Sequence, residues 1–226
     1  AVLVYHAGDS VHRPLGMLTV LTFLWQDPVL AERTGFAYEA EDVFRLKRMV
    51  DRHLQAPHDH LCITDDPSQF PERCGIRAIP LKRKFVQPDR IYDPIYAFSP
   101  DLKEQGDRFL KIDLDCVVVG DLDPLVNRPE PLVLWRNPRL MGWDDGVLPR
   151  LDKPGTMAWY NGSLMLFAAG ARPDLWDEFD ESKIQPGWKG DQDWIAQKLG
   201  PDMPFWNGDR DGVYRLAVVR PRQKLA

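Results

Sequence analysis

The sequence predicts an α/β fold with a mainly parallel central sheet flanked by helices. Short apolar runs and amphipathic stretches alternate between residues 18 and 119, which is the order of elements that βαβ units produce. Most of these runs are apolar at consecutive positions, which is typical of strands buried on both faces. The chain has 226 residues, enough for one large domain with a substantial core. In such sheets, ligands bind at the carboxyl ends of the strands.

The first predicted element is a buried strand at residues 18–25, which are continuously apolar and rich in β-branched side chains. A loop follows at residues 27–37, where Pro28 and Gly35 lie. Residues 41–54 predict an amphipathic helix, because their apolar side chains recur at helical spacing with charged side chains between them. Residues 60–64 and 76–81 predict two further strands.

Residues 91–98 predict a helical segment after Pro94. Residues 109–119 predict the most apolar strand of the chain, interrupted only by Asp113 and Asp115. Beyond Gly120 prolines and loops dominate. The elements predicted there are strands at 132–135 and 163–168, followed by helices at 173–179 and 191–199.

We expect one domain at residues 17–226. Met17 directly precedes the first predicted strand, so residues 1–16 are interpreted as an N-terminal extension without an assigned role.

The composition argues against several classes of protein. The net charge is -5 and no long basic run occurs, so a nucleic-acid-binding surface is not expected. No apolar stretch is long enough for a transmembrane helix. The three cysteines, Cys62, Cys74 and Cys116, are widely spaced and odd in number. They predict a reducing, cytoplasmic environment rather than a disulfide framework.

Two aspartates in an apolar run are the most informative feature of the sequence. On a continuous strand, Asp113 and Asp115 would project from the same face. Two such charges are costly unless a cation compensates them, and carboxylates suit Mg²⁺ or Mn²⁺ together with substrate phosphates. The alternative is that the strand ends at Ile112 and both aspartates are solvated turn residues.

Three histidines lie close together in the sequence. His53, His58 and His60 resemble a metal-binding cluster by their number. They straddle the end of a predicted helix and the start of a predicted strand, which favours solvated or capping roles.

Three segments resemble a known family. Residues 112–125 read IDLDCVVVGDLDPL, residues 159–167 read WYNGSLMLF, and residues 190–193 read GDQD. Together they resemble the GT-A glycosyltransferases, particularly the glycogenin-like family 8 enzymes and their bacterial relatives. In that family the first segment binds a metal, the second lines the donor site and the third faces the reacting sugar. The resemblance extends from about Met17 to about Leu199 and implies a GT-A fold.

The resemblance implies a transferase that moves a sugar from a nucleotide-diphosphate donor, expected to be a UDP-sugar, to an acceptor saccharide, lipid or protein. Asp113 and Asp115 would hold Mn²⁺ or Mg²⁺. Asp191 and Gln192 would be catalytic, although Asp191 is also placed like a helix N-cap. The residues expected to bind the donor are Thr22, Phe23, Leu24, Tyr38, Arg45, Asp113, Leu114, Asn161 and Gly162.

The chain also departs from the family pattern. Family 8 enzymes carry a late His-x-x-Gly-x-Lys motif, whereas no histidine follows His60 here. The family often has a lysine before the metal-binding strand, where this chain has Asp93 and Pro94. These departures leave open whether anomeric configuration is retained or inverted.

Two other functions fit part of the pattern. A degenerate GT-A domain would bind a nucleotide sugar without turnover. A haloacid-dehalogenase-like phosphatase would use Asp113 as nucleophile and Asp115 as general acid. That family places its motif on the first strand, whereas three predicted strands precede it here.

Overall fold

A computed structural model describes residues 2–4, 17–26, 31–32, 37–83, 90–137, 159–188, 190–206 and 208–215, and it confirms the predicted α/β fold. Its main sheet has seven strands in the order β4-β3-β2-β5-β8-β7-β9. The strands β4, β3, β2 and β5 are parallel, and β8 runs antiparallel to both β5 and β7. The bounds are β2 Leu18–Leu24, β3 His58–Thr64, β4 Arg77–Pro80, β5 Arg108–Ile112, β7 Leu132–Arg136, β8 Tyr160–Ala168 and β9 Phe205–Trp206.

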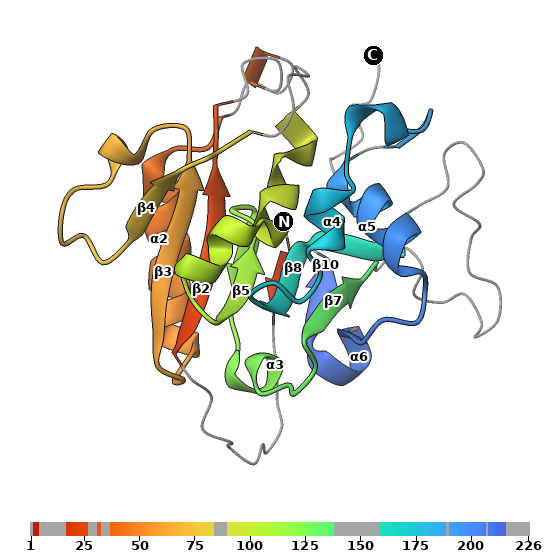
Figure 1. The fold of residues 1–226 in the computed structure, drawn as a ribbon. Helices are drawn as coiled ribbons and strands as arrows, with labels where there is room; N and C mark the ends of the chain where they lie inside the picture. The colour runs from red at the N-terminus through yellow and green to blue at the C-terminus, as the bar shows by residue number, and fades with distance from the viewer. Residues whose placement is uncertain are drawn as a thin grey trace, which may run out of the picture.

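Two layers of apolar side chains cover the two faces of this sheet. On one face, Leu21 and Phe23 of β2 belong to a core that includes the 3₁₀ helix η2 (Arg90–Phe98), α4 (Asp174–Asp177) and α5 (Asp191–Leu199). On the other face, Leu18 and Val20 pack with α2 (Ala40–His53). Figure 1 shows η2, α4 and α5 on the side of the sheet opposite to α2. The central strands are therefore buried on both faces, as their continuous apolar runs predict.

The helix predicted at residues 41–54 is α2, Ala40–His53. Val43, Leu46 and Val50 are buried at the spacing that an amphipathic helix requires. Its N-terminus is closed by a capping box between Glu39 and Asp42.

The prediction of one continuous strand at residues 109–119 is wrong. β5 ends at Ile112, residues 113–115 form a turn, and the strand β6 (Cys116–Val118) follows. The backbone N–H of Cys116 donates to the carbonyl of Asp113 across this turn, at 3.0 Å. The chain turns because β6 leaves the main sheet and joins a different one.

That second sheet has the strand order β10-β1-β6. β1 (Val2–Val4) is parallel to β6 and antiparallel to β10 (Val213–Arg215). Part of the predicted N-terminal extension, residues 2–4, thus pairs with the strand that directly follows Asp115. The rest of residues 1–16 lies outside the described residues.

The remaining elements are short connectors. They are η1 Pro67–Gln69, η3 Pro100–Glu104, α3 Asp123–Val126, η5 Glu181–Lys183 and α6 Gly208–Asp211. No helix in the part of the chain that the structure describes is long and apolar enough to cross a membrane.

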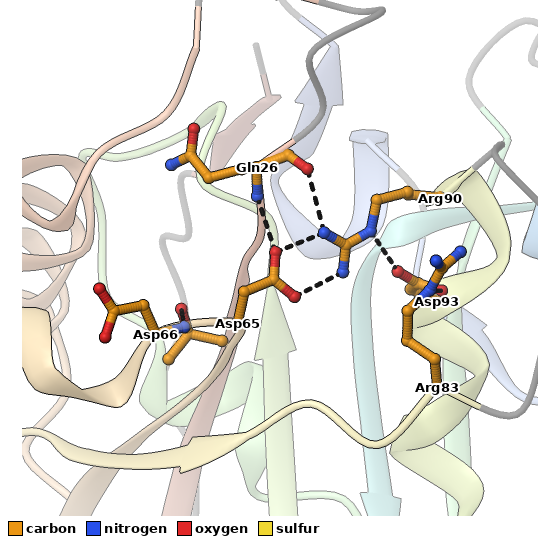
Figure 2. A network of polar contacts seen from close by, with 7 residues as sticks. Gln26, Asp65, Asp66, Arg83, Arg90 and Asp93 are labelled. Atoms are coloured by element: carbon orange, nitrogen blue, oxygen red, sulfur yellow. Dashed lines mark hydrogen bonds and ion pairs between the residues drawn. The ribbon is translucent and has the colours of Figure 1, made fainter.

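An arginine joins η2 to the carboxyl ends of two strands (Figure 2). The guanidinium of Arg90 donates to the carbonyl of Gln26 just after β2 at 3.0 Å, and it binds both carboxylate oxygens of Asp65 just after β3. Arg90 Nε also donates to Asp93 at 2.8 Å, and Arg83 donates to the other oxygen of Asp93 at 3.2 Å. This network positions η2 at the sheet edge where the parallel strands end.

Candidate functional site

A cavity of about 430 Å³ opens at the edge of the main sheet where β2 and β5 end. Because β8 runs antiparallel to β5, its first residues reach the same edge, and so does the N-terminus of α5. The lining residues are Phe23, Leu24, Trp25, Ala37, Tyr38, Ile91, Pro94, Lys111, Asp113, Leu114, Asp115, Asn161, Gly162, Ser163, Asp191 and Gln192.

Asp113 and Asp115 both line the cavity, although they lie in a turn rather than on one strand face. The argument from alternation along a strand was therefore wrong for this pair, while the expectation that both carboxylates share one site agrees with the cavity lining. The turn is fixed because the backbone N–H of Asp113 donates to the carbonyl of Ser163 on β8 at 2.9 Å. The side chain of Asp113 remains 38% exposed, so it is accessible from the cavity.

Lys111 is a site residue that sequence reasoning missed. It lies on β5, two residues before Asp113 and one before the strand ends. Its side chain is only 2% exposed, and Nζ donates to Asp113 Oδ1 and to the carbonyl of Gly162, each at 2.5 Å. Burial opposes the charged form, but the carboxylates of Asp113 and Asp191 outweigh it and raise the pKa of Lys111. A lysine inside an apolar strand, two positions before a carboxylate, was the available signal.

Asp191 is the most deeply buried carboxylate of the site. Burial raises its pKa to about 6; the charge of Lys111 counteracts this, and that of Asp113 adds to it. Its Oδ2 is buried and has no hydrogen-bond partner among the described residues. The interpretation of Asp191 as an N-cap is wrong, because the N-cap of α5 is Gly190 and Asp191 is the first helical residue. A Cβ at position 190 would lie 2.9 Å from Cγ1 of Ile91, so the helix start requires glycine.

Asn161 and Gly162 lie in an irregular part of β8. Leu134 of β7 pairs with Met165, but the next residue, Trp135, pairs with Asn161, so residues 162–164 bulge from the ladder. The Oδ1 of Asn161 accepts a hydrogen bond from the N–H of Ser163 at 2.8 Å and stabilises this bulge. A Cβ at position 162 would lie 3.2 Å from Asp191 Oδ2, so glycine allows Asp191 to approach the strand.

Part of the cavity lining is an apolar and aromatic wall. Phe23 and Leu24 come from the end of β2, Trp25 follows them, and Tyr38 precedes α2. Burial together with the charges of Asp115 and Asp113 raises the pKa of Tyr38 to about 12. Tyr38 therefore adjoins the acidic turn as well as the aromatic wall.

Two predicted donor-binding residues do not line the cavity. Thr22 is buried beside Cys62 of β3, two residues before the end of β2. Arg45 is 60% exposed and pairs with Asp42 on the same helix at 2.6 Å. The other predicted residues, including Leu114 and Gln192, all line it.

The acidic turn, residues 113–115, suits a divalent cation that is also coordinated by the phosphates of a bound substrate. Three carboxylates, those of Asp113, Asp115 and Asp191, line the cavity against one lysine, and Asp191 Oδ2 lacks a partner among the described residues. Hard oxygen donors and excess negative charge fit Mg²⁺ or Mn²⁺, which keep several positions for phosphates and water. The one close group of three His, Cys, Asp or Glu residues among those described lies elsewhere, at Asp51, His58 and His60.

Comparison with known proteins supports the fold. No protein-family model and no curated protein matches the chain. Among solved structures, the chain is similar to the apo form of the glycosyltransferase GlyE of Streptococcus pneumoniae TIGR4, with 15% sequence identity and a TM-score of 0.51. The match covers 85% of this chain and 46% of that one, so this chain spans less than half of that protein. At this identity the match shows that the two chains share a fold.

Proposed function

We propose that this chain is a glycosyltransferase that binds a nucleotide-sugar donor in the cavity, with Mn²⁺ or Mg²⁺ held by Asp113 and Asp115. The observation that carries the proposal is that cavity, where six separate segments of the sequence bring together aromatic side chains, the acidic turn and a buried carboxylate. A nucleotide sugar has three parts with matching chemistry: an aromatic base, a diphosphate and a polar ring.

The base is assigned to the aromatic wall. Phe23, Trp25 and Tyr38 of the lining offer ring surface, and stacking of a base on an aromatic side chain is typically worth ~1–3 kcal/mol. Tyr38 is the proposed stacking residue, with uracil as the proposed base.

The diphosphate is assigned to the acidic turn. A divalent cation there would neutralise the negative charge that develops on the leaving diphosphate. Lys111 holds Asp113 through a direct hydrogen bond, so this carboxylate keeps one orientation before any ligand arrives. Lys111 also anchors the carbonyl of Gly162, which couples the acidic turn to β8.

The sugar is assigned to Asn161, Gly162, Asp191 and Gln192. During transfer, the bond from the anomeric carbon to the diphosphate oxygen breaks and the acceptor hydroxyl oxygen forms the new bond. Positive charge develops at the anomeric carbon, and the carboxylate of Asp191 would stabilise it. A buried carboxylate acts strongly because little water screens it.

The test is metal-dependent UDP binding, measured by isothermal titration calorimetry. UDP affinity should rise at least ~10-fold when Mn²⁺ replaces chelator, and Asp115→Asn should abolish this rise. Asp121→Asn is the matched control, because Asp121 has the same chemistry but does not line the cavity. If UDP binds equally well in chelator, or if Asp115→Asn still responds to Mn²⁺, the metal assignment is wrong.

A further inference from the structure

A second cluster of metal-ligand side chains lies where β3 begins, away from the donor cavity, which is lined from the ends of β2 and β5. His58 and His60 are two residues apart on β3, so both rings lie on one face of the strand. Asp51 comes from the last turn of α2. One ligand atom from each of the three side chains lies within 4.8 Å of the other two.

The three side chains converge on one carboxylate oxygen. Asp51 Oδ1 lies 3.2 Å from His58 Nε2 and 2.8 Å from His60 Nε2, and the two rings pack edge to face with centroids 5.1 Å apart. The other oxygen of Asp51 is bound by Lys47 Nζ at 2.5 Å. Lys47 therefore contacts Oδ2, and both histidines contact Oδ1.

The tautomer of His58 places a lone pair towards that oxygen. His58 Nδ1 lies 2.8 Å from the carbonyl oxygen of Ala56, which can only accept, so Nδ1 carries a proton and donates it. In a neutral imidazole the remaining nitrogen, Nε2, is then an acceptor, and it faces Asp51 Oδ1, a second acceptor. Histidines that bind metals are commonly oriented in this way, with the non-ligating N–H donated to a carbonyl or a carboxylate.

Two of the three separations between these atoms suit a small divalent cation. Zinc bonds of about 2.0–2.1 Å at tetrahedral angles place neighbouring ligand atoms about 3.3 Å apart. The Asp51–His58 separation of 3.2 Å already has this value, and the Asp51–His60 separation of 2.8 Å needs a small increase. His60 and His58 are largely buried, whereas the side chain of Asp51 is 39% exposed, so the group lies at the surface on the side of Asp51.

We propose that Asp51, His58 and His60 bind a zinc ion that joins the end of α2 to the start of β3. Two imidazole nitrogens and one carboxylate oxygen are ligands that Zn²⁺ takes, with water in the fourth position. The site is independent of the donor cavity, whose oxygen ligands suit Mg²⁺ or Mn²⁺. It acts as a structural clip between two elements of the fold.

The experiment titrates Zn²⁺ into chelator-treated, full-length protein, with competition against a chromophoric chelator. One Zn²⁺ should bind per chain at this site, and His58→Gln and Asp51→Asn should each weaken it at least ~100-fold. His53→Gln is the matched control, because His53 lies on the same helix end but outside the group. Asp115→Asn should leave Zn²⁺ affinity unchanged, and His58→Gln should leave Mn²⁺-dependent UDP binding unchanged. The zinc site and the proposed donor site can therefore each be disproved without affecting the other.

Two further readouts test the zinc site. Co²⁺ in place of Zn²⁺ should give visible absorption bands that His58→Gln abolishes. The melting temperature should rise by roughly 5–10 °C at a Zn²⁺ concentration 100 times the Kd. Circular dichroism checks that each variant folds. The proposal is wrong if the chain binds no Zn²⁺, or if folded His58→Gln and Asp51→Asn bind it as tightly as wild type. Either result would show that hydrogen bonds, and no metal ion, link these three side chains.

Discussion

Asp191 places a carboxylate where ionisation is costly. It is buried at 8% exposure, its Oδ2 has no partner among the described residues, and its pKa is raised to about 6 from an ordinary value of 3.8. The folded protein therefore binds this proton more tightly than the unfolded chain does. Stability falls as the pH rises from about 3.8 to about 6, and the penalty persists at higher pH.

Asp191→Asn should separate stability from activity. Two pKa units correspond to ~3 kcal/mol, so the variant should gain up to that free energy of unfolding at pH 7 and almost none at pH 4. Because the charge is lost, transfer should slow by ~10²–10³ with donor affinity little changed. Urea unfolding in chelator at both pH values measures the first effect. A variant less stable than wild type at pH 7 would contradict the account.

Single residues of the site were predicted unevenly. Asp113 and Asp115 stand out because charges interrupt an apolar run. Lys111 interrupts the same run but was overlooked, because a lone lysine beside Asp113 does not reveal in sequence that the distant Asp191 also lies close to it. Thr22 is expected to bind the donor but does not line the cavity, and a continuously apolar strand has no alternation that shows which of its residues do.

At the scale of elements, η2 depends on one ion-pair network. Ile91 and Pro94 of η2 line the cavity, and Arg90 binds Gln26, Asp65 and Asp93 (Figure 2). Arg90 Cζ also lies 6.0 Å from the centroid of the Trp25 ring. The arginine thus links one cavity wall to the ends of β2 and β3.

Arg90→Gln should destabilise the protein by ~2–4 kcal/mol, because it leaves the buried Asp93 carboxylate with fewer partners. UDP affinity should fall as well, since the wall formed by η2 and Trp25 loses its anchor. Arg48→Gln is the control: Arg48 forms an exposed ion pair with Glu41, and its removal should change neither quantity measurably. Denaturant unfolding measures the free energy of unfolding, and titration measures UDP affinity. If Arg90→Gln changes these two quantities no more than Arg48→Gln does, the Arg90 network does not support the part of the cavity formed by η2 and Trp25.

Elements with strong periodicity were predicted well, and long-range partners were not. The amphipathic helix α2 and the apolar strand β2 are visible locally because burial imposes their patterns. The division of residues 109–119 into β5 and β6 depends on a second sheet whose other strands lie at both ends of the chain. Likewise, buried Asp123 accepts from the backbone N–H groups of Gln55 and Ala56, at 2.8 and 2.7 Å, a pairing that no local pattern reveals.

At the scale of the whole molecule, topology explains why the site forms at one edge. β2 and β5 are parallel neighbours, so their carboxyl ends meet, and antiparallel β8 begins where β5 ends. Segments from residue 23 to residue 192 therefore converge on one cavity. The sequence predicted this edge because ligands bind at the carboxyl ends of parallel strands, and the likeness to GlyE supports the same architecture.

The most direct test of the central claim is UDP release from a panel of UDP-sugars, with Mn²⁺ or with chelator, in the presence of candidate acceptor saccharides. We expect that at least one UDP-sugar is cleaved and that cleavage requires the metal. Asp115→Asn should abolish it, Asp191→Asn should slow it by ~10²–10³, and Asp121→Asn should leave it unchanged. A domain that binds UDP with Mn²⁺ but releases none would be a degenerate transferase. Phosphate release from a simple monoester, with no UDP released from any sugar nucleotide, would contradict the account and indicate a phosphatase instead.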